Sequence, residues 1–331
     1  MNHTKEPKEY FENIQQIFQQ FFSNIDFNYH PEELYEPIRY VLSNTGKQIR
    51  PTLVLMAADF FDADLNDALH AATAVEIFHN FTLVHDDIMD NAEIRRGKPS
   101  VYKKYGLSSA ILVGDTMFAR AYEFVTKISE QKLVQGLNLF NQISIQVCEG
   151  QQLDLNFEKK QILSLDEYFN MIKLKTAVLI AGCLKLGSLL GNADEKTQEL
   201  MYDLGYNMGM LFQIQDDIMD LYANETIFGK KIGNDILDAK KTILYVLALE
   251  ALSEKEKENF IELYHSQNID PALKTQEVKN LFALHQVKER AQTWINKFKN
   301  QTNLIIDSLP LSTDQKNILI YLLQLIENRK S

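Results

Sequence analysis

The same acidic pentapeptide, Asp-Asp-Ile-Met-Asp, occurs twice in the chain, at residues 86–90 and at residues 216–220. In a helix, residues four apart lie on one face, so the first and last Asp of each repeat are expected to be neighbours. Carboxylates this close repel each other by roughly 3 kcal/mol at an effective dielectric constant of 20. Oxygen ligands without Cys or His favour Mg²⁺, which pairs with phosphates. The repeats therefore predict a magnesium-dependent phosphate site, and the alternative is two acidic helix ends that only face solvent.

Basic residues flank both repeats. They are Lys47 and Arg50 near a helix start, Arg95 and Arg96 after the first repeat, Lys175 within an apolar helix, and Lys230, Lys240 and Lys241 after the second repeat. Each alone is best interpreted as a surface charge. Together they supply the second half of a diphosphate site, in which metal ions lie on one side and Arg or Lys on the other.

Composition limits the possible partners. The chain has 331 residues, of which 45% are hydrophobic and 24% charged, and its formal net charge is −11. Such a chain lacks the basic face that nucleic acids require, so no nucleic-acid partner is expected. Cys148 and Cys183 have no paired spacing and no His neighbours, which indicates buried thiols in a reducing compartment.

Helical periodicity dominates the elements that must position these residues. Apolar residues recur every three or four positions from Asn66 to Asp90, and Gly and Pro number only 13 and 7. Further helices are predicted over Pro31–Leu42, Leu53–Phe61, Leu107–Ile128, Leu133–Leu155, Leu165–Leu190, Glu195–Leu221, Thr242–Leu252, Val278–Leu309 and Thr313–Asn328. The sequence contains no period-two strand pattern and no Gly/Ser-rich or Pro-rich linker. We expect an all-α fold with one domain over residues 1–331, of which residues 1–30 form a peripheral N-terminal segment.

Neither a transmembrane segment nor a secretory signal is predicted. The longest apolar stretch, Thr176–Leu190, is interrupted by Lys185 and is shorter than the about 20 residues that cross a bilayer. Residues 1–20 mix Lys, Glu and Gln without an apolar centre. These features predict a cytoplasmic protein.

Taken in order, these motifs resemble those of the trans-isoprenyl diphosphate synthases, the polyprenyl synthetase family, and especially its short-chain geranylgeranyl and farnesyl diphosphate synthases. The similarity extends from about Pro31 to the last helix. Its segments are Gly-Lys-x-x-Arg-Pro at 46–51, Glu-x-x-His-x-x-x-Leu-x-His-Asp-Asp-x-x-Asp at 76–90, Arg-Arg-Gly-x-Pro at 95–99, Gly-Asp at 114–115, Gly-Gln-x-x-Asp at 150–154, Lys-Thr-Ala at 175–177, Phe-Gln-x-Gln-Asp-Asp-x-x-Asp at 212–220 and Gly-Lys at 229–230.

The resemblance implies a homodimer of helical bundles, each around a deep central cavity, that joins isopentenyl diphosphate to an allylic diphosphate in isoprenoid biosynthesis. It implies about three Mg²⁺ ions on Asp86, Asp90 and Asp216, supported by Asp87, Asp217 and Asp220. The allylic diphosphate would contact Arg95, Lys175, Lys230 and Lys240. Isopentenyl diphosphate would be bound by Lys47, Arg50, His79 and Arg96. Thr176 and Gln213 would face the allylic carbocation.

The implied chemistry agrees with the residue types. Metal ions and basic side chains stabilise the departing diphosphate, the isopentenyl double bond attacks the carbocation, and the released diphosphate removes the proton. No protein general base is required. The chain departs from the family pattern where Gln48 replaces a common Arg, Asn44-Thr45 a Gly, Lys231 a Pro and Ala239 a Gly, but no expected ligand is lost.

Product length is expected to depend on the residues upstream of Asp86. A helix rises about 1.5 Å per residue, so side chains four and five positions earlier lie roughly 6 to 7.5 Å deeper. These positions hold the small Thr82 and the large Phe81, with Phe78 a further turn down. One aromatic residue five positions upstream resembles enzymes that stop at geranylgeranyl diphosphate, which is the predicted product. Farnesyl diphosphate is the alternative, and ordinary core packing is the other interpretation of Phe81.

Three other functions would each account for part of the sequence pattern. A carboxylate-bridged di-iron bundle could use Glu-x-x-His pairs at 76–79 and 262–265, but it leaves both acidic repeats unexplained. A class I terpene cyclase usually has a second metal motif with Asn, Ser, Thr or Glu, unlike residues 216–220. A non-catalytic partner subunit commonly loses one acidic motif, and this chain retains both.

Overall fold

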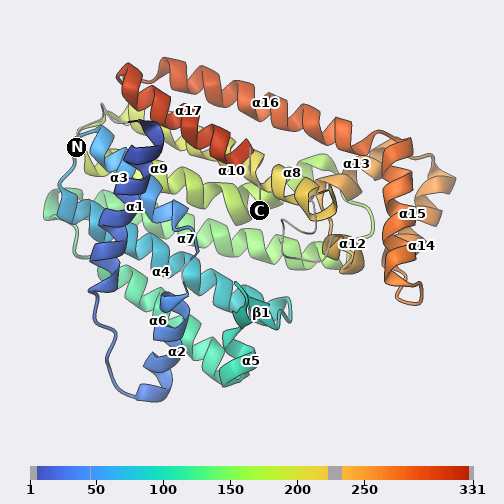
Figure 1. Cartoon of the computed structure of the whole chain (residues 1–331), viewed down its shortest axis with the longest axis horizontal. Helices are drawn as coiled ribbons and strands as arrows, with labels where there is room; N and C mark the ends of the chain where they lie inside the picture. Colours follow the sequence, from blue (N-terminus) through green and yellow to red (C-terminus); the bar gives the residue numbers. More distant parts are fainter. Residues whose placement is uncertain (1–5, 45, 223–232, 328–331) are drawn as a thin grey trace. The chain divides into compact units, whose positions relative to one another are not determined.

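The computed structural model describes residues 6–44, 46–222 and 233–327 (Figure 1). Within these ranges regular structure is helical, apart from the two-residue strands β1 (Ile94–Arg95) and β2 (Lys98–Pro99), which pair antiparallel. The all-α prediction is confirmed. The chain divides into a first compact unit, Met1–Gln142 with Gly182–Tyr202 and Leu311–Ile318, and a second unit, Ile143–Ala181 with Asp203–Pro310 and Leu319–Ser331.

The first unit is built around a long helix, α4, that packs against α3 and α6. Its helices are α1 (Pro7–Ser23), α2 (Glu32–Ser43), α3 (Ile49–Phe60), α4 (Leu65–Met89), α5 (Val101–Tyr105) and α6 (Leu107–Val125). The Asp64 side chain caps the start of α4 by accepting hydrogen bonds from the amides of Asn66 and Asp67. The C-terminal end of α4 carries the first acidic repeat.

Helix α1 is packed against α3 rather than left in solvent. Tyr10, Ile14 and Phe18 on one face of α1 are buried, which is the pattern of an amphipathic helix with its apolar stripe on the core. The Tyr10 hydroxyl also donates to Asp59 Oδ2 at 2.6 Å. The N-terminal segment therefore contributes to the core of the first unit.

The second unit contains α8 (Leu165–Ile172), a π-helical turn η1 (Lys173–Ala177), α12 (Asn234–Leu237), α13 (Ile243–Ala251), α14 (Glu254–His265), α15 (Pro271–Leu284) and α16 (Val287–Ser308). Within it α13, whose residues are almost all buried, packs against α8, α15 and α16. Four further helices have residues in both units: α7 (Glu130–Glu158), α9 (Val178–Leu190), α10 (Glu195–Tyr222) and α17 (Thr313–Glu327).

Three predicted helices differ from those observed. The single helix expected over Val278–Leu309 is wrong: α15 and α16 are separated at Gln286, whose φ of 52° is left-handed and breaks the helical path. The helix expected over Leu165–Leu190 is interrupted by η1. A π turn inserts one residue into a helix without changing its apolar pattern, so the sequence does not reveal it. Helix α3 begins at Ile49, four residues before the predicted start, directly after left-handed Gln48.

Among the described residues, no helix combines the length and the apolar composition needed to cross a membrane.

Candidate active site

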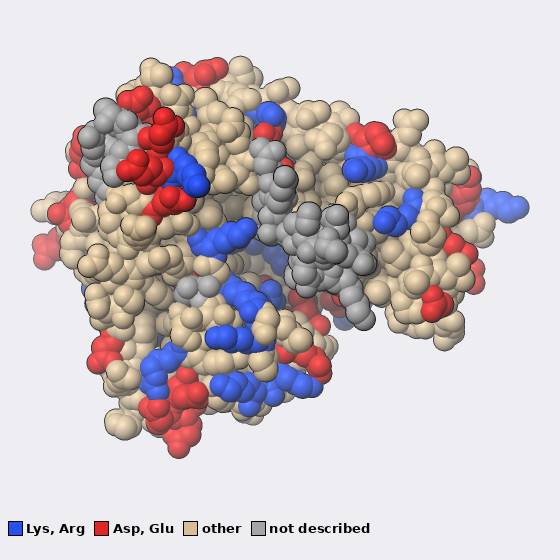
Figure 2. Space-filling model, in the orientation of Figure 1, with Lys and Arg blue, Asp and Glu red and all other residues tan. Residues whose placement is uncertain are grey.

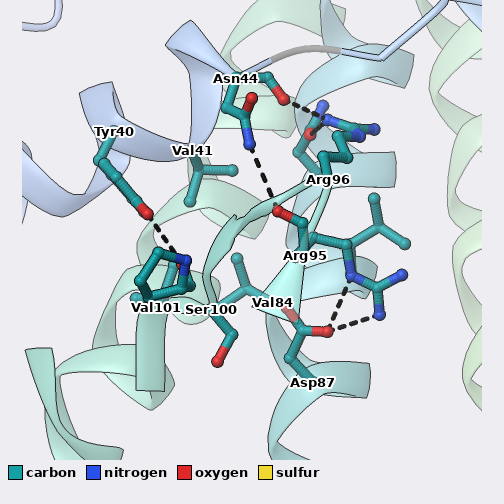
Figure 3. A pocket seen from close by; sticks show the side chains of 12 residues that line it. Tyr40, Val41, Asn44, Val84, Asp87, Arg95, Arg96, Ser100 and Val101 are labelled. Atoms are coloured by element: carbon teal, nitrogen blue, oxygen red, sulfur yellow. Dashed lines mark hydrogen bonds and ion pairs between the residues drawn. The ribbon is translucent and has the colours of Figure 1, made fainter. Parts of the chain in front are cut away.

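The first acidic repeat contains one buried and two accessible carboxylates. Asp87 is 3% exposed, and Arg95 donates to its Oδ1 through Nε at 2.8 Å and through Nη2 (Figure 3). Burial raises the pKa of the Asp87 carboxyl, whereas its hydrogen bonds with Arg95 lower it. Asp86 is half-buried and Asp90 is exposed. Arg95 thus binds the middle carboxylate, and the two outer ones, which are less buried, lie on one helix face.

The β1–β2 hairpin brings Arg95 and Arg96 to this end of α4. Arg96 and Gly97 form its turn with φ values of 52° and 74°. Arg96 Nη1 donates to the carbonyl oxygen of Asn44 at 2.7 Å and to Asn80 Oδ1 at 3.2 Å (Figure 3). A cavity of about 30 Å³ lies beneath the hairpin. Figure 2 shows Lys and Arg side chains gathered over the hairpin and α5.

Arg50 and His79 are directly hydrogen-bonded, with Arg50 Nη1 at 3.0 Å from His79 Nε2. A guanidinium can only donate, so His79 Nε2 accepts and the imidazole is neutral. Burial lowers the pKa of His79 well below its usual value, and Arg50, Arg96 and Arg95 lower it further. Glu76, 1% exposed, accepts from Asn80 Nδ2 at 2.9 Å, and Asn80 also binds Arg96.

Three of the four residues predicted to bind isopentenyl diphosphate are thus connected. Arg50 on α3 contacts His79 on α4, and Arg96 on the hairpin contacts Asn80, the next residue of α4. The fourth, Lys47, is exposed on the segment before α3. Its backbone carbonyl accepts from Gln15 Nε2 on α1 at 2.8 Å.

The residues predicted to limit product length lie in an aromatic cluster. Phe78 and Phe81 on α4 are buried, with ring centroids 5.5 Å apart, and Phe118 on α6 lies 5.1 Å from Phe81. Phe140 on α7 packs edge-on against Phe78 at 5.6 Å. Thr82 is half-buried, and its hydroxyl donates to the carbonyl of His79 at 2.8 Å. Phe81 therefore has aromatic neighbours on two helices of the first unit.

The second acidic repeat, on α10, repeats this division of carboxylates. Asp217 is 6% exposed and accepts from the Tyr168 hydroxyl at 2.7 Å, the Ile243 amide at 2.9 Å and Gln213 Nε2 at 2.8 Å. Burial raises its pKa to about 6 against the opposing effect of these hydrogen bonds. Asp216 and Asp220 are half-buried. The amide of Asp235 donates to Asp220 Oδ2 at 3.0 Å.

Thr176 and Gln213 are joined to Asp217 in one chain of hydrogen bonds. The Thr176 hydroxyl donates to Gln213 Oε1 at 2.9 Å, and Gln213 Nε2 donates onward to Asp217. These two hydrogen bonds fix the orientation of the Gln213 amide. The Thr176 hydroxyl uses its proton in the bond to Gln213, so the Thr176 oxygen still has lone pairs to offer.

Lys175 and Thr176 lie in η1, where the helix is widened. Lys175 Nζ forms an ion pair with Asp154 Oδ2 at 2.5 Å. The turn is packed closely by glycines: a Cβ at Gly150 on α7 would be 2.2 Å from the Lys175 amide nitrogen, and one at Gly209 on α10 would be 2.6 Å from Ala177 Cα. Small residues on two helices therefore leave room for the π turn.

Lys240 is exposed and lines a cavity of about 150 Å³ with Asp154, Lys175, Thr176, Gln213, Asp216 and other residues of the second unit. Asp235 lines the same cavity, and burial beside Asp220 and Asp217 raises the pKa of Asp235 to about 8. The predicted ligand Lys230 lies outside the described residues.

Three residues of this cavity have no role that the sequence analysis predicts. Asp154 was recognised only as the end of Gly-Gln-x-x-Asp, although its spacing from Gly150 places it one turn away on the same helix face. Asp235 is too far along the sequence from the second repeat for helical periodicity to predict that the two lie together. Tyr168 carries no local signal, because its contact with Asp217 joins residues far apart in the chain.

Both acidic repeats have the chemistry to hold a hard divalent cation. Each offers two accessible carboxylates four residues apart and no Cys or His. Among the described residues no group of three His, Cys, Asp or Glu side chains is already gathered as a metal site. A small cation that keeps waters and binds substrate phosphate oxygens fits such sparse oxygen ligands.

Comparison with known proteins identifies similar sequences and folds. The family model described as Polyprenyl synthetase matches residues 31–282. A geranylgeranyl diphosphate synthase of Methanosarcina mazei is 40% identical over 222 residues, covering 66% of this chain and 68% of that protein. A geranylgeranyl pyrophosphate synthase of Geoglobus acetivorans is 35% identical over 84% of this chain and 86% of its own length. The crystal structure of geranylgeranyl pyrophosphate synthetase from Pyrococcus horikoshii has a TM-score of 0.90 at 33% identity, covering 98% of this chain and all of that one.

Proposed function

The chain belongs to the polyprenyl synthetase family, and from this we propose that it condenses isopentenyl diphosphate with allylic diphosphates as a trans-prenyltransferase. One observation carries the proposal. In each acidic repeat the middle Asp is buried and bound by the protein, and the first and last Asp lie on one helix face. Two such arrangements suit the binding of metal ions and diphosphate.

The family depends on divalent metal ions, and we propose Mg²⁺, about three per active site, on the accessible carboxylates. Asp86, Asp90 and Asp216 are assigned as ligands, and Asp220 as support. Asp87 and Asp217 act through their neighbours, because protein donors already occupy them. The bound cations supply electrostatic stabilisation of the departing diphosphate.

The chain's own residues divide the remaining tasks. Arg95, Lys175, Lys240 and, outside the described residues, Lys230 are assigned to the allylic diphosphate. Lys47, Arg50, His79 and Arg96 are assigned to isopentenyl diphosphate. His79 is neutral beside Arg50, so it can orient the guanidinium without adding a charge.

The reaction breaks the carbon–oxygen bond of the allylic diphosphate. The isopentenyl double bond supplies the electron pair of the new carbon–carbon bond, and a proton leaves to the released diphosphate. The lone pairs of Thr176 and the amide oxygen of Gln213 are assigned to face the positive charge, and the hydrogen bonds from Thr176 to Gln213 and from Gln213 to Asp217 support this assignment. Basic side chains retain the diphosphate while the charge on carbon exists.

We propose geranylgeranyl diphosphate as the main product, with farnesyl diphosphate as the alternative. The proposal is supported by the burial of Phe81 among Phe78, Phe118 and Phe140, because a floor of packed aromatic rings resists displacement by a growing chain. Relatives in Methanosarcina mazei and Geoglobus acetivorans bear the name of a geranylgeranyl diphosphate synthase.

We further propose a homodimer and a single polyprenyl synthetase domain. Leu107, Ile111 and Leu112 on α6 are 54%, 43% and 58% exposed, which is an apolar surface that a second copy could cover. Sedimentation equilibrium would test the dimer, and one cooperative unfolding transition would support the single domain. The cytoplasmic location stays a prediction of the sequence.

The function is tested by incubating purified protein with Mg²⁺, labelled isopentenyl diphosphate and each of the five-, ten- and fifteen-carbon allylic starters. A series of products that ends at twenty carbons is expected. A fifteen-carbon end would retain the activity and revise the product. Folded protein that condenses none of the starters would contradict the proposed function and favour a cyclase or a partner subunit.

A further inference from the structure

A tight turn between α12 and α13 presents Lys240 to the cavity of the second unit. Ala239, the residue before it, has a φ of 52°, a left-handed conformation that disfavours any residue with a Cβ. The Ala239 amide donates to the carbonyl of Ile236 at 3.2 Å, and the Lys240 amide to that of Asp235 at 2.8 Å. These backbone hydrogen bonds leave the carbonyls of Ala239 and Lys240 to be satisfied elsewhere.

Side chains satisfy both carbonyls. Lys241 Nζ donates to the Ala239 carbonyl at 3.0 Å, and the Tyr264 hydroxyl on α14 donates to the Lys240 carbonyl at 2.8 Å. The peptide units on the two sides of Lys240 are therefore each held by a side-chain donor. These two contacts hold the backbone from which the Lys240 side chain extends.

The Lys241 ammonium is itself fixed from several sides. Lys241 is 6% exposed, its Nζ lies 3.1 Å from His265 Nε2, and it stands 4.8 Å from the centre of the Tyr245 ring. An ammonium can only donate, so His265 accepts and is neutral, as its lowered pKa requires. Burial lowers the pKa of Lys241 to about 8, with Glu158 acting to raise the pKa and Lys274 to lower it.

Burying a lysine in this manner is costly, and the fold gains no accessible charge from it. Lys241 lines the cavity beside Lys240, but its side chain is buried and its Nζ donates to the Ala239 carbonyl, so its ammonium is directed at the turn that carries Lys240. We propose that Lys241 is a positioning residue that holds the left-handed turn at Ala239 and so sets the place of Lys240 for diphosphate binding. This rests on the proposed function, in which Lys240 contacts the allylic diphosphate.

The proposal predicts that the contribution of Lys241 depends on which residue occupies position 239. A glycine adopts a positive φ without the steric cost of a Cβ, so a turn with glycine at 239 needs less support. The contribution of Lys241 should therefore be smaller in an Ala239→Gly background. A residue that only packed against α14 would contribute equally in both backgrounds, which separates positioning from packing.

The experiment measures binding of inorganic diphosphate in the presence of Mg²⁺ by titration calorimetry on the full chain. Lys241→Met, which retains an apolar stem, is expected to weaken binding about tenfold. Measured against Ala239→Gly itself, the double variant Ala239→Gly/Lys241→Met should lose only about threefold. The KM for the allylic substrate should rise in parallel, and kcat should change less.

Tyr264→Phe provides a second test that retains the buried ring and removes the hydroxyl, which donates to the Lys240 carbonyl at 2.8 Å and lies 3.4 Å from the Asp235 carbonyl. We expect it to weaken diphosphate binding about threefold, even if Lys241→Met fails to fold. Parental affinity in Tyr264→Phe, or an equal loss from Lys241→Met in both backgrounds, would overturn the proposal while leaving the proposed function intact. A parent chain that binds no diphosphate would overturn the proposed function and this proposal with it.

Discussion

Gly150 on α7 lies against the backbone of Lys175, so that a Cβ at residue 150 would stand 2.2 Å from the Lys175 amide nitrogen. No rotamer relieves such a contact, because it is made with backbone atoms. The helix carrying Lys175 and Thr176 must move if residue 150 acquires a side chain. Helix spacing at this point is thus tied directly to the position of two proposed site residues.

Gly150→Ala should therefore lower kcat/KM by roughly 10- to 100-fold, because small displacements of positioning groups are costly in catalysis. Gly136→Ala on the same helix is the matched control, since its Cβ would meet Ile128 and Leu186 at ordinary distances of 3.6 and 3.7 Å. It should retain activity and gain about 0.5 kcal/mol of stability from helix propensity. Steady-state kinetics and urea unfolding of Gly150→Ala and Gly136→Ala test this prediction. Equal kcat/KM values in the two variants would contradict it.

Asp87 and Asp90 should respond oppositely to the same substitution. Asp87→Asn breaks a buried ion pair with Arg95 and should reduce the free energy of unfolding by about 2 kcal/mol. Asp90→Asn removes an exposed negative charge at a helix C-terminus and should raise stability by about 0.5 kcal/mol. Activity should fall in both. Thermal unfolding measures the contrast, and a stable Asp87→Asn would show that its burial is unimportant.

His79 should make the protein less stable in mild acid. Its pKa is lowered in the folded state, so below about pH 6.5 the unfolded chain takes up a proton that the folded chain does not. The free energy of unfolding therefore falls as the pH falls through that value, by about 1 kcal/mol over one pH unit. His79→Gln, which can still accept from Arg50, should lose less stability between pH 7 and pH 5.5. Urea denaturation at both pH values tests this, and parallel losses would refute it.

Phe81→Ala should lengthen the products beyond those of the parent, because it opens the aromatic cluster between α4 and α6. The change should also cost about 3 kcal/mol of stability. Phe124→Ala is the control, since Phe124 is similarly buried on α6 but packs near His70 instead. Product chains separated by length should shift only in the first variant. Unchanged lengths in Phe81→Ala would leave Phe81 as ordinary core.

Local patterns predicted the parts of the site that lie on single helices. Residues 86–90 and 216–220 were recognisable because a helix places residues four apart together, and α4 and α10 keep their apolar period to the end. The pattern could not show that Arg95 binds Asp87 or that Tyr168 binds Asp217. These contacts depend on a hairpin turn and on tertiary packing, neither of which leaves a period in the sequence.

The same limit applies to backbone conformation. The π turn at Lys173–Ala177 and the left-handed residues Gln48, Ala239 and Gln286 occur at residue types that do not demand them. At the π turn, the backbone of Lys175 is packed against Gly150, a residue that precedes it by a long stretch of sequence. Gln48 and Ala239, which depart from the family pattern, both have a positive φ, and a side chain donates to the carbonyl of each, Thr52 at residue 48 and Lys241 at residue 239.

The buried middle carboxylate of each acidic repeat has a consequence for the order of events. Donors from the chain satisfy Asp87 and Asp217 whether or not an ion is present, so the ends of α4 and α10 are shaped before any cation arrives. Binding a cation at the outer, less buried carboxylates then requires little refolding of these helix ends. Chelation should accordingly silence the enzyme reversibly and leave its helices intact, which makes metal supply a rapid switch on turnover rather than a requirement for maturation.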